Sequence, residues 1–314
     1  MKIILPIAGK GVRLRPYTNE LPKCLLPVGG KTIIDWIVED ANRLTPKETI
    51  FIAGYKAEKI QEYLEKKPEW GNTRVVLQMN PQGLGEAIAR GLPYVNDGEP
   101  LLIILGDTLF EADLAQLEFA EDNVLYTYKV SDPRRFGVAV TNEKGEITEL
   151  VEKPQTYVSD EAIVGIYYIK DTAELRKALR KMISKDIRSN GEIQLTDALQ
   201  MMIEAGCKFK TAPVERWLDC GLPETLIDTN SIMLSKNDNS ANFHFPGTKI
   251  IPPCHIGKNV KLENCTIGPN VDLGDNCSLR FVNIKNCVVW ANESLSFTLI
   301  ENQIVASCWW LRSQ

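Results

Sequence analysis

Two glycines near the N-terminus, Gly9 and Gly11, form the first pattern in this sequence that could do chemistry. They follow an apolar run, and their spacing allows a tight turn whose backbone N–H groups can approach a phosphate. Arg13 and Lys23 come soon afterwards and would add positive charge. The pattern departs from the dinucleotide-binding fingerprint, because Leu14 stands where that motif has a glycine. By itself, the pattern predicts a tight loop that could hold an anion.

A second candidate phosphate loop, Gly30-Lys31-Thr32, resembles the end of a P-loop. That motif requires a glycine five residues earlier, where this chain has Leu25. Thr32 is followed three places on by Asp35 and by apolar residues at helical spacing, which is typical of a capped helix start. We therefore expect a turn at the glycines and a helix start at Thr32, without phosphate binding.

Apolar, β-branched runs alternate with helical patterns over much of the chain. This alternation predicts an α/β fold with a mostly parallel sheet. Strands are expected at residues 2–7, 49–53, 74–79, 101–105, 124–130, 136–141 and 163–169. Helices are expected at residues 32–44, 55–66, 84–95, 171–184, 193–205 and 223–235. Asp107 follows one of these strands, and ligand sites of open α/β sheets lie beyond the carboxyl ends of strands.

The chain changes character after the polar stretch 235–240, which is typical of a linker. Beyond it, a leucine or isoleucine recurs at steps of mostly five or six residues, often followed by turn residues. The repeat positions are Ile256, Leu262, Ile267, Leu273, Leu279, Ile284, Leu295 and Ile300. Short apolar steps with turn residues at the corners predict a small left-handed β-helix of the hexapeptide type. We therefore expect two domains, residues 1–236 and residues 241–314.

The chain contains eight cysteines but no CxxC pair. In a chain of this length without an export signal, these cysteines predict buried free thiols rather than a disulfide scaffold. A zinc site is the alternative for the four cysteines of the repeat region, but their spacing fits no zinc template. These four are Cys254, Cys265, Cys277 and Cys287.

Composition limits the classes of partner. The 314 residues include 36 Lys and Arg against 41 Asp and Glu, which gives a net charge of −5. No sequence-wide basic field exists to hold nucleic acid or an anionic membrane, so a small anionic ligand would need a local cationic site. No apolar run approaches the roughly 18 residues of a membrane span, and the N-terminal run is too short for a signal peptide. We therefore expect a cytoplasmic protein that binds neither nucleic acid nor membrane.

A long pattern surrounds the two N-terminal glycines and is far more specific than they are. It runs from Pro6 to Thr18 and continues from Leu21 to Lys31. Later matches follow in order: Gln78-Met79-Asn80-Pro81-Gln82-Gly83, Gly106-Asp107, Phe136-Gly137-Val138, Glu152-Lys153-Pro154, Gly165-Ile166-Tyr167, Gly191-Glu192, Thr196-Asp197 and Trp217-Leu218-Asp219-Cys220-Gly221. Over about residues 1–235 the chain resembles the sugar-1-phosphate nucleotidylyltransferases, or NDP-sugar pyrophosphorylases. The repeat region resembles an appendage that many members carry.

The resemblance implies a Rossmann-like enzyme that joins a nucleoside triphosphate to a sugar 1-phosphate, giving NDP-sugar and pyrophosphate. The sugar phosphate attacks the α-phosphorus in line, so the protein must mainly neutralise charge and align two anions. By family analogy, Arg13 binds the leaving pyrophosphate, Lys23 the phosphates at the reaction centre, and Lys153 the phosphate of the sugar. Asp107 and Asp219 would hold Mg²⁺, which prefers carboxylate and phosphate oxygens. These five residues are the expected catalytic set.

The resemblance also implies which residues bind the substrates. Gln78 carries an amide that suits the O4 and N3–H edge of uracil or thymine, which favours UTP or dTTP. The sequence does not distinguish UTP from dTTP, because thymine differs from uracil only by a methyl group, which contributes only about 1 to 3 kcal/mol to binding in a pocket. For the acceptor, glucose 1-phosphate is favoured. The expected nucleotide-binding residues are Ala8, Gly9, Gly11, Gln78, Pro81 and Gly83, and the expected sugar-binding residues are Gly137, Glu152, Ile163 and Val164.

Two other functions share this architecture. One is a catalytically silent, nucleotide-sugar-binding regulatory subunit, which the retained set of paired carboxylates and cations argues against. The other is a bifunctional enzyme with an acyltransferase tail, which would use a histidine base, and the tail offers only His244 and His255. We expect the tail to serve packing or assembly, with Trp309-Trp310-Leu311 at its end, and the protein to be a homo-oligomer.

Overall fold

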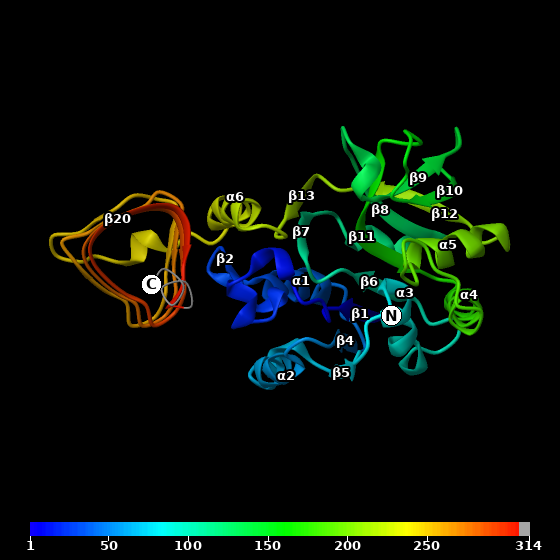
Figure 1. The fold of residues 1–314 in the computed structure, drawn as a ribbon, viewed down its shortest axis with the longest axis horizontal. Coiled ribbons are helices and arrows are strands. Elements are labelled where there is room, and N and C mark those ends of the chain that lie inside the picture. Colours follow the sequence, from blue (N-terminus) through cyan, green and yellow to red (C-terminus); the bar gives the residue numbers. More distant parts are fainter. Residues whose placement is uncertain (308–314) are drawn as a thin grey trace. The chain divides into compact units, whose positions relative to one another are not determined.

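The structure is a computed structural model that describes residues 1–307 (Figure 1). Contacts divide the chain into two compact units, and neither unit is one continuous stretch of sequence. Unit 1 comprises residues 1–9, 37–106 and 110–217, and unit 2 comprises residues 10–36, 107–109 and those from 218 onward. The expected domain border at residues 237–240 therefore differs from the division into compact units. The expected role of Trp309-Trp310-Leu311 falls outside the described residues.

Unit 1 contains a nine-stranded sheet in the order β10-β9-β11-β6-β1-β4-β5, with β8 pairing with β11 and β12. The strands are β1 (Lys2–Pro6), β4 (Thr49–Ala53), β5 (Thr73–Leu77), β6 (Leu101–Ile104), β8 (Asn123–Lys129), β9 (Gly137–Thr141), β10 (Ile147–Glu152), β11 (Glu161–Ile169) and β12 (Phe209–Pro213). Strands β6, β1, β4 and β5 are parallel, whereas β11 is antiparallel to β6, β8 and β9. The predicted α/β fold is confirmed, with an antiparallel part around β11.

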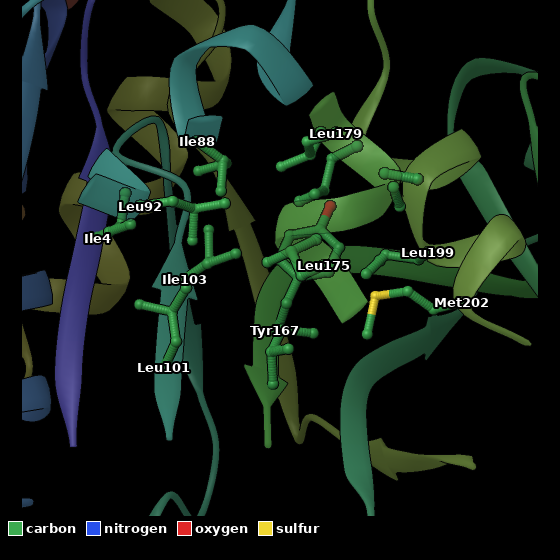
Figure 2. Packing of buried hydrophobic residues seen from close by; sticks show 14 of the residues in the cluster. Ile4, Ile88, Leu92, Leu101, Ile103, Tyr167, Leu175, Leu179, Leu199 and Met202 are labelled. Carbon is green, nitrogen blue, oxygen red and sulfur yellow. The ribbon is translucent and has the colours of Figure 1, made fainter. Parts of the chain in front are cut away.

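The first five helices each bury one face. They are α1 (Ile33–Asn42), α2 (Ala57–Glu65), α3 (Leu84–Gly91), α4 (Thr172–Ser184) and α5 (Leu195–Glu204). In α4, the side chains at positions 175, 178, 179 and 182 are buried, the spacing of a single helix face. Figure 2 shows residues of α3, α4 and α5 meeting residues of β1, β6 and β11 in one apolar cluster. Within residues 1–307, no helix has both the length and the apolar character needed to cross a bilayer.

Two of the expected features at the start of α1 are confirmed. The hydroxyl of Thr32 accepts a hydrogen bond from the backbone N–H of Asp35 at 3.2 Å, and Asp35 Oδ2 accepts one from the N–H of Thr32 at 2.9 Å. This reciprocal cap begins the helix at Ile33. Gly29 and Gly30 turn the chain between β2 (Pro27–Val28) and β3 (Lys31–Thr32), both with positive φ.

Unit 2 contains a coil of short parallel strands. They are β14 (Lys249–Ile250), β15 (Cys254–Ile256), β16 (Lys261–Glu263), β17 (Thr266–Ile267), β18 (Val271–Leu273), β19 (Ser278–Val289) and β20 (Ser294–Val305). Cys254 pairs with Val271, which pairs with Cys287, so the chain returns to the same face after each coil. The recurring leucines and isoleucines point inward and form the core. The predicted β-helix is confirmed.

Asparagines in the left-handed conformation form the corners of this β-helix. Asn259, Asn276 and Asn292 have φ values of 58°, 59° and 67°. Their amides form a ladder, because each Nδ2 donates to Oδ1 of the asparagine one coil further on, at 3.1 Å in both steps. A second ladder joins Asn270, Asn286 and Asn302. Asparagine tolerates this backbone conformation better than other residues with a side chain, which explains its recurrence.

Replacing Asn276 tests the demand for a left-handed corner. We expect Asn276→Ala to lower the stability of the tail by about 2 kcal/mol and Asn276→Gly to lower it by about 1 kcal/mol. Both variants lose the amide ladder, but only alanine carries a Cβ into the left-handed region. Thermal unfolding followed by circular dichroism measures the difference. Equal losses in the two variants would contradict a conformational requirement at this corner.

The cysteines of the tail are structural. All seven cysteines within residues 1–307 are free, as predicted. The four thiols of the β-helix donate to backbone carbonyls, for example Cys277 Sγ to Trp290 O at 3.0 Å. Burial raises the pKa of the Cys277 and Cys287 thiols to about 11. Within the described residues no three His, Cys, Asp or Glu side chains gather in a group that could hold a metal ion.

The polar stretch 235–240 is not a free linker, contrary to the expectation from its composition. Asp238 Oδ1 accepts hydrogen bonds from the N–H groups of Ser240 and Cys254, and Asn239 Oδ1 accepts one from Ile256 N–H at 2.7 Å. Asn237 Nδ2 donates to Gly29 O at 2.8 Å. These side chains form hydrogen bonds with backbone groups of the first coil and of the Gly29 turn, which explains why a polar sequence is ordered here.

The β-helix also binds the turn at Gly29 and Gly30, which belongs to the same unit. Asp272 Oδ2 accepts a hydrogen bond from Gly30 N–H at 2.8 Å, while its Oδ1 lies 3.0 Å from His255 Nδ1. A Cβ at Gly30 would lie 2.5 Å from the His255 ring. Asn230 of α6 (Pro223–Leu234) accepts from Gly29 N–H. Gly30 is thus required by its close packing against the β-helix.

Candidate functional site

A lysine and an aspartate form an ion pair in unit 2. Lys23 opens a short 3-10 helix after Pro22, and Asp107 stands directly before β7 (Thr108–Glu111). Lys23 Nζ lies 3.3 Å from Asp107 Oδ2. The lysine side chain is 12% exposed, whereas the aspartate side chain is 50% exposed. The cation is therefore held against a carboxylate that remains open to a further ligand.

A second aspartate, Asp219, ends β13 (Arg216–Asp219) shortly before α6. Its Oδ1 accepts a hydrogen bond from Gly221 N–H at 2.8 Å, and its Oδ2 accepts one from the Thr225 hydroxyl at 3.3 Å. A carboxylate oxygen can accept more than one such contact, so both oxygens can still coordinate a cation. The two hydrogen bonds fix the orientation of the Asp219 carboxylate and leave both of its oxygens able to bind a cation.

Strands β7 and β13 pair with each other, and this pairing brings the two aspartates into the same region. The N–H of Glu215 donates to the carbonyl of Glu111 at 2.8 Å, so the start of β13 faces the end of β7 and the strands are antiparallel. Asp107 directly precedes β7, and Asp219 is the last residue of β13. Because the start of one strand lies beside the end of the other in an antiparallel pair, Asp107 and Asp219 lie near each other.

The pKa of a buried thiol, that of Cys220 next to Asp219, depends on the charges of these groups. Burial raises the pKa of Cys220 to about 12, the neighbouring Lys23 opposes this rise, and Asp219 and Asp107 add to it. Cys220 is fully buried, so the thiol stays protonated and inert near neutral pH. The same three charged side chains thus act on one buried atom, which supports their grouping.

The two aspartates fit a magnesium ion by their chemistry. They offer hard carboxylate oxygens, and one of them is half exposed. Two protein carboxylates leave coordination positions for water and for phosphate oxygens, the usual arrangement for Mg²⁺ at a phosphoryl-transfer site. Asp107 and Asp219 are the residues that would hold the ion.

The N-terminal glycine pattern forms the expected tight turn. Gly11 has φ 57°, and a Cβ there would lie 2.9 Å from Thr18 Cγ2, so both conformation and space require glycine. The Thr18 hydroxyl donates to Gly11 O at 2.9 Å and holds the turn. Around Gly9 nothing lies within 4 Å of a Cβ position, so its backbone is open to a ligand. Arg13 is exposed on the 3-10 helix that follows.

Gln78 lies just beyond β5 in unit 1 and is 4% exposed. Its Nε2 donates to Glu86 Oε2 at 2.6 Å and lies 3.4 Å from Gly83 O. Gly83 has φ 123°, and a Cβ there would lie 2.5 Å from Ile193 O. Glycine at this position is therefore required by the close backbone of Ile193, in addition to any space it leaves for a base. Pro81 is exposed in the same loop.

The expected sugar-binding residues gather elsewhere in unit 1. Glu152, at the end of β10, places Oε1 3.5 Å from Lys153 Nζ and accepts a hydrogen bond at Oε2 from the Thr196 hydroxyl at 2.7 Å. A Cβ on Gly137 would lie 3.0 Å from Glu152 Oε2, so glycine leaves this carboxylate accessible. Ile163 and Val164 of β11 are 6% and 2% exposed, so both residues are almost fully buried.

Sequence reasoning missed two residues of these clusters. Thr196 was noted only as part of a motif, although its hydroxyl orients Glu152. Glu86 was not noted at all, although its carboxylate contacts Gln78. Glu86 stands eight residues after Gln78, across a turn, and no local pattern signals that pairing. The only signal in the sequence is that Glu86, an acidic residue, stands on the apolar face of a helix, where an acidic side chain needs a partner.

Comparison with known proteins decides the family. The family model described as nucleotidyl transferase matches residues 1–236, about three quarters of the chain. The chain belongs to the nucleotidyl transferase family. All the candidate site residues of this nucleotidyl transferase lie within the matched range, and the family predicted from its motifs is confirmed.

Several known proteins are similar to this nucleotidyl transferase. The low-salt glycan biosynthesis nucleotidyltransferase Agl11 of Haloferax volcanii is 28% identical, over 94% of this chain and 89% of its own. The UTP--glucose-1-phosphate uridylyltransferase AglF of the same organism is 29% identical, over 71% of this chain and 93% of its own. The bifunctional protein GlmU of Methanocaldococcus jannaschii is 34% identical over 75% of this chain. The match spans only 55% of GlmU.

Proposed function

We propose that this nucleotidyl transferase couples a nucleoside triphosphate, UTP or dTTP, to a sugar 1-phosphate, glucose 1-phosphate being favoured. The products are an NDP-sugar and pyrophosphate. The observation that carries the proposal is the ion pair of desolvated Lys23 with half-exposed Asp107, near Asp219. Such a cluster of one cation and two carboxylates suits a metal-bound phosphate. The similarity to AglF, a UTP--glucose-1-phosphate uridylyltransferase, supports the choice of UTP and glucose 1-phosphate.

In this reaction a phosphate oxygen of the sugar 1-phosphate forms a bond to the α-phosphorus. The bond from the α-phosphorus to the bridging oxygen breaks, and pyrophosphate leaves with the electron pair. The attacking phosphate is already ionised, so no side chain has to remove a proton. The work of the protein is to hold two anions in line and to neutralise their charge.

Each cluster has a role in this scheme. Lys23 neutralises charge at the transferring phosphate, and Arg13, exposed on its 3-10 helix, binds the pyrophosphate end. Lys153, whose side chain is 45% exposed, binds the phosphate of the sugar, and Glu152 accepts hydrogen bonds from sugar hydroxyls. Magnesium held by Asp107 and Asp219 would polarise phosphate oxygens as a Lewis acid.

Residues 1–236 form the catalytic domain in this proposal, and the β-helix serves packing or assembly in a homo-oligomer. The matched range of the family model supports that border. An acyltransferase tail is less well supported, because His255 is engaged with Asp272 in holding the Gly30 turn. The match to GlmU also leaves almost half of that protein without a counterpart.

Pyrophosphate release from the purified protein with Mg²⁺ tests the proposal. UTP, dTTP, CTP, ATP and GTP are each combined with the 1-phosphates of glucose, galactose, mannose and N-acetylglucosamine. We expect release with a uracil or thymine nucleotide and glucose 1-phosphate, and little with purine nucleotides. If every pair is silent while nucleotide sugars bind by calorimetry, the chain is a regulatory subunit and the proposal is wrong.

A further inference from the structure

A buried carboxylate stands behind the side chain expected to contact the nucleobase. Glu86 lies on α3, is 6% exposed, and has charged and polar partners on both oxygens. Its Oε2 accepts a hydrogen bond from Gln78 Nε2 at 2.6 Å. Its Oε1 accepts one from Arg90 Nε, one helical turn further along α3. The buried carboxylate is thus paired with a cation, which offsets the free-energy cost of its burial.

The contact decides which way round the Gln78 amide lies. A glutamine side chain can be rotated to exchange its oxygen and nitrogen, but an ionised carboxylate only accepts hydrogen bonds. Glu86 therefore attracts Nε2 of Gln78 and repels Oε1. The carbonyl of Gly83, 3.4 Å from the same nitrogen, is also an acceptor and favours the same orientation. The Glu86 carboxylate and the Gly83 carbonyl thus both hold the amide nitrogen of Gln78 toward the interior.

The oxygen of the amide is then the end left for a ligand. Within residues 1–307, no hydrogen bond uses Gln78 Oε1, and this atom is not among the fully enclosed oxygens that lack a partner. A fixed acceptor complements the N3–H donor of uracil or thymine. Cytosine carries an acceptor at N3, so two acceptors would face each other. The rotated amide would have the opposite preference.

We propose that Glu86, held by Arg90, is a positioning residue that sets the nucleobase preference of the enzyme. It acts through Gln78, whose oxygen it directs toward the base, and so it selects bases with an N3–H donor over cytosine. This inference rests on the proposed function, in which Gln78 contacts the base. Glu86 itself does not touch the substrate.

The test replaces Glu86 with glutamine and compares UTP with CTP. The new amide can offer either an oxygen or a nitrogen to Gln78, so both orientations of Gln78 become accessible. We expect the ratio of kcat/KM for UTP to that for CTP to fall by about tenfold, which corresponds to one hydrogen bond. The change should appear in the KM for the nucleotide, while the KM for the sugar phosphate stays unchanged.

A matched control is available on the surface. Gln61 Nε2 donates to exposed Glu65 at 3.3 Å, so Glu65→Gln makes the same change in the same kind of pair, and it should leave the ratio unchanged. Where Glu86→Gln fails to fold, Arg90→Gln removes the outer partner of the carboxylate and is judged by the same ratio. An equal loss of activity with UTP and CTP, or an unchanged ratio, would show a merely structural Glu86 and overturn the proposal.

Failure of the proposed function gives a different result. If the wild-type protein transfers no nucleotide, calorimetric binding of UTP and of CTP to the wild-type and Glu86→Gln proteins replaces the kinetic ratio, with the same expected fall. If the wild-type protein transfers nucleotides but prefers ATP or GTP, nucleotidyl transfer stands. The assigned role of Glu86 is then wrong, because Glu86 can affect the preference only if Gln78 contacts a pyrimidine base.

Discussion

Asp107→Asn is expected to lower kcat/KM for NDP-sugar formation by about a thousandfold. Asparagine keeps the shape of the side chain but replaces an anionic ligand with a weak neutral one, which removes several kcal/mol of charge stabilisation at the phosphate. It also leaves Lys23 without its carboxylate partner in a largely desolvated position. The initial rate of pyrophosphate release, measured over a range of Mg²⁺ concentrations, gives the result. Part of the loss should be recovered at high Mg²⁺.

The control for this substitution is Asp186→Asn. Asp186 pairs with Arg188 at the surface of unit 1 and has a positive φ that asparagine also accepts. We expect its kcat/KM to match that of the wild-type protein, because exposed ion pairs contribute little. A loss of less than about tenfold in Asp107→Asn, with no change in Mg²⁺ dependence, would show that the ion is held elsewhere.

Lys23→Met is expected to lower kcat by about a hundredfold. Methionine keeps much of the aliphatic stem but removes the charge that would neutralise the transferring phosphate. The lysine side chain is only 12% exposed, so water cannot readily replace the lost cation. Lys177→Met, an exposed lysine paired with Glu174 on α4, is the matched control and should retain wild-type activity.

A double substitution shows whether Lys23 and Asp107 act together. If the two residues serve one phosphate site, the Lys23→Met and Asp107→Asn losses should not multiply, and the double variant should resemble the worse single variant. A loss equal to the product of the two single losses would mean that the residues act independently. That result would remove the main support for a shared phosphate and metal site.

The sequence by itself determined the family and much of the fold. The strands β1, β4 and β6 and the helices α4 and α6 lie within a few residues of their expected positions, because long apolar runs and helical periods are local signals. The β-helix followed from a repeat in which each step places one apolar residue inward. The site residues followed from motif resemblance, since the residue types that bind phosphate and metal are few.

Only the tertiary structure decided the remaining features, since they depend on residues far apart in the chain. Strands β7, β10, β12 and β13 were not predicted, because short strands that gain stability from their neighbours carry little pattern of their own. Without β7 and β13, nothing in the sequence places Asp107 near Asp219. The polar stretch 235–240 was expected to be a linker, but its side chains accept hydrogen bonds from backbone N–H groups of the first coil of the β-helix. Likewise, Glu86 acquires its role only from packing, since a carboxylate orients an amide solely when folding buries them together.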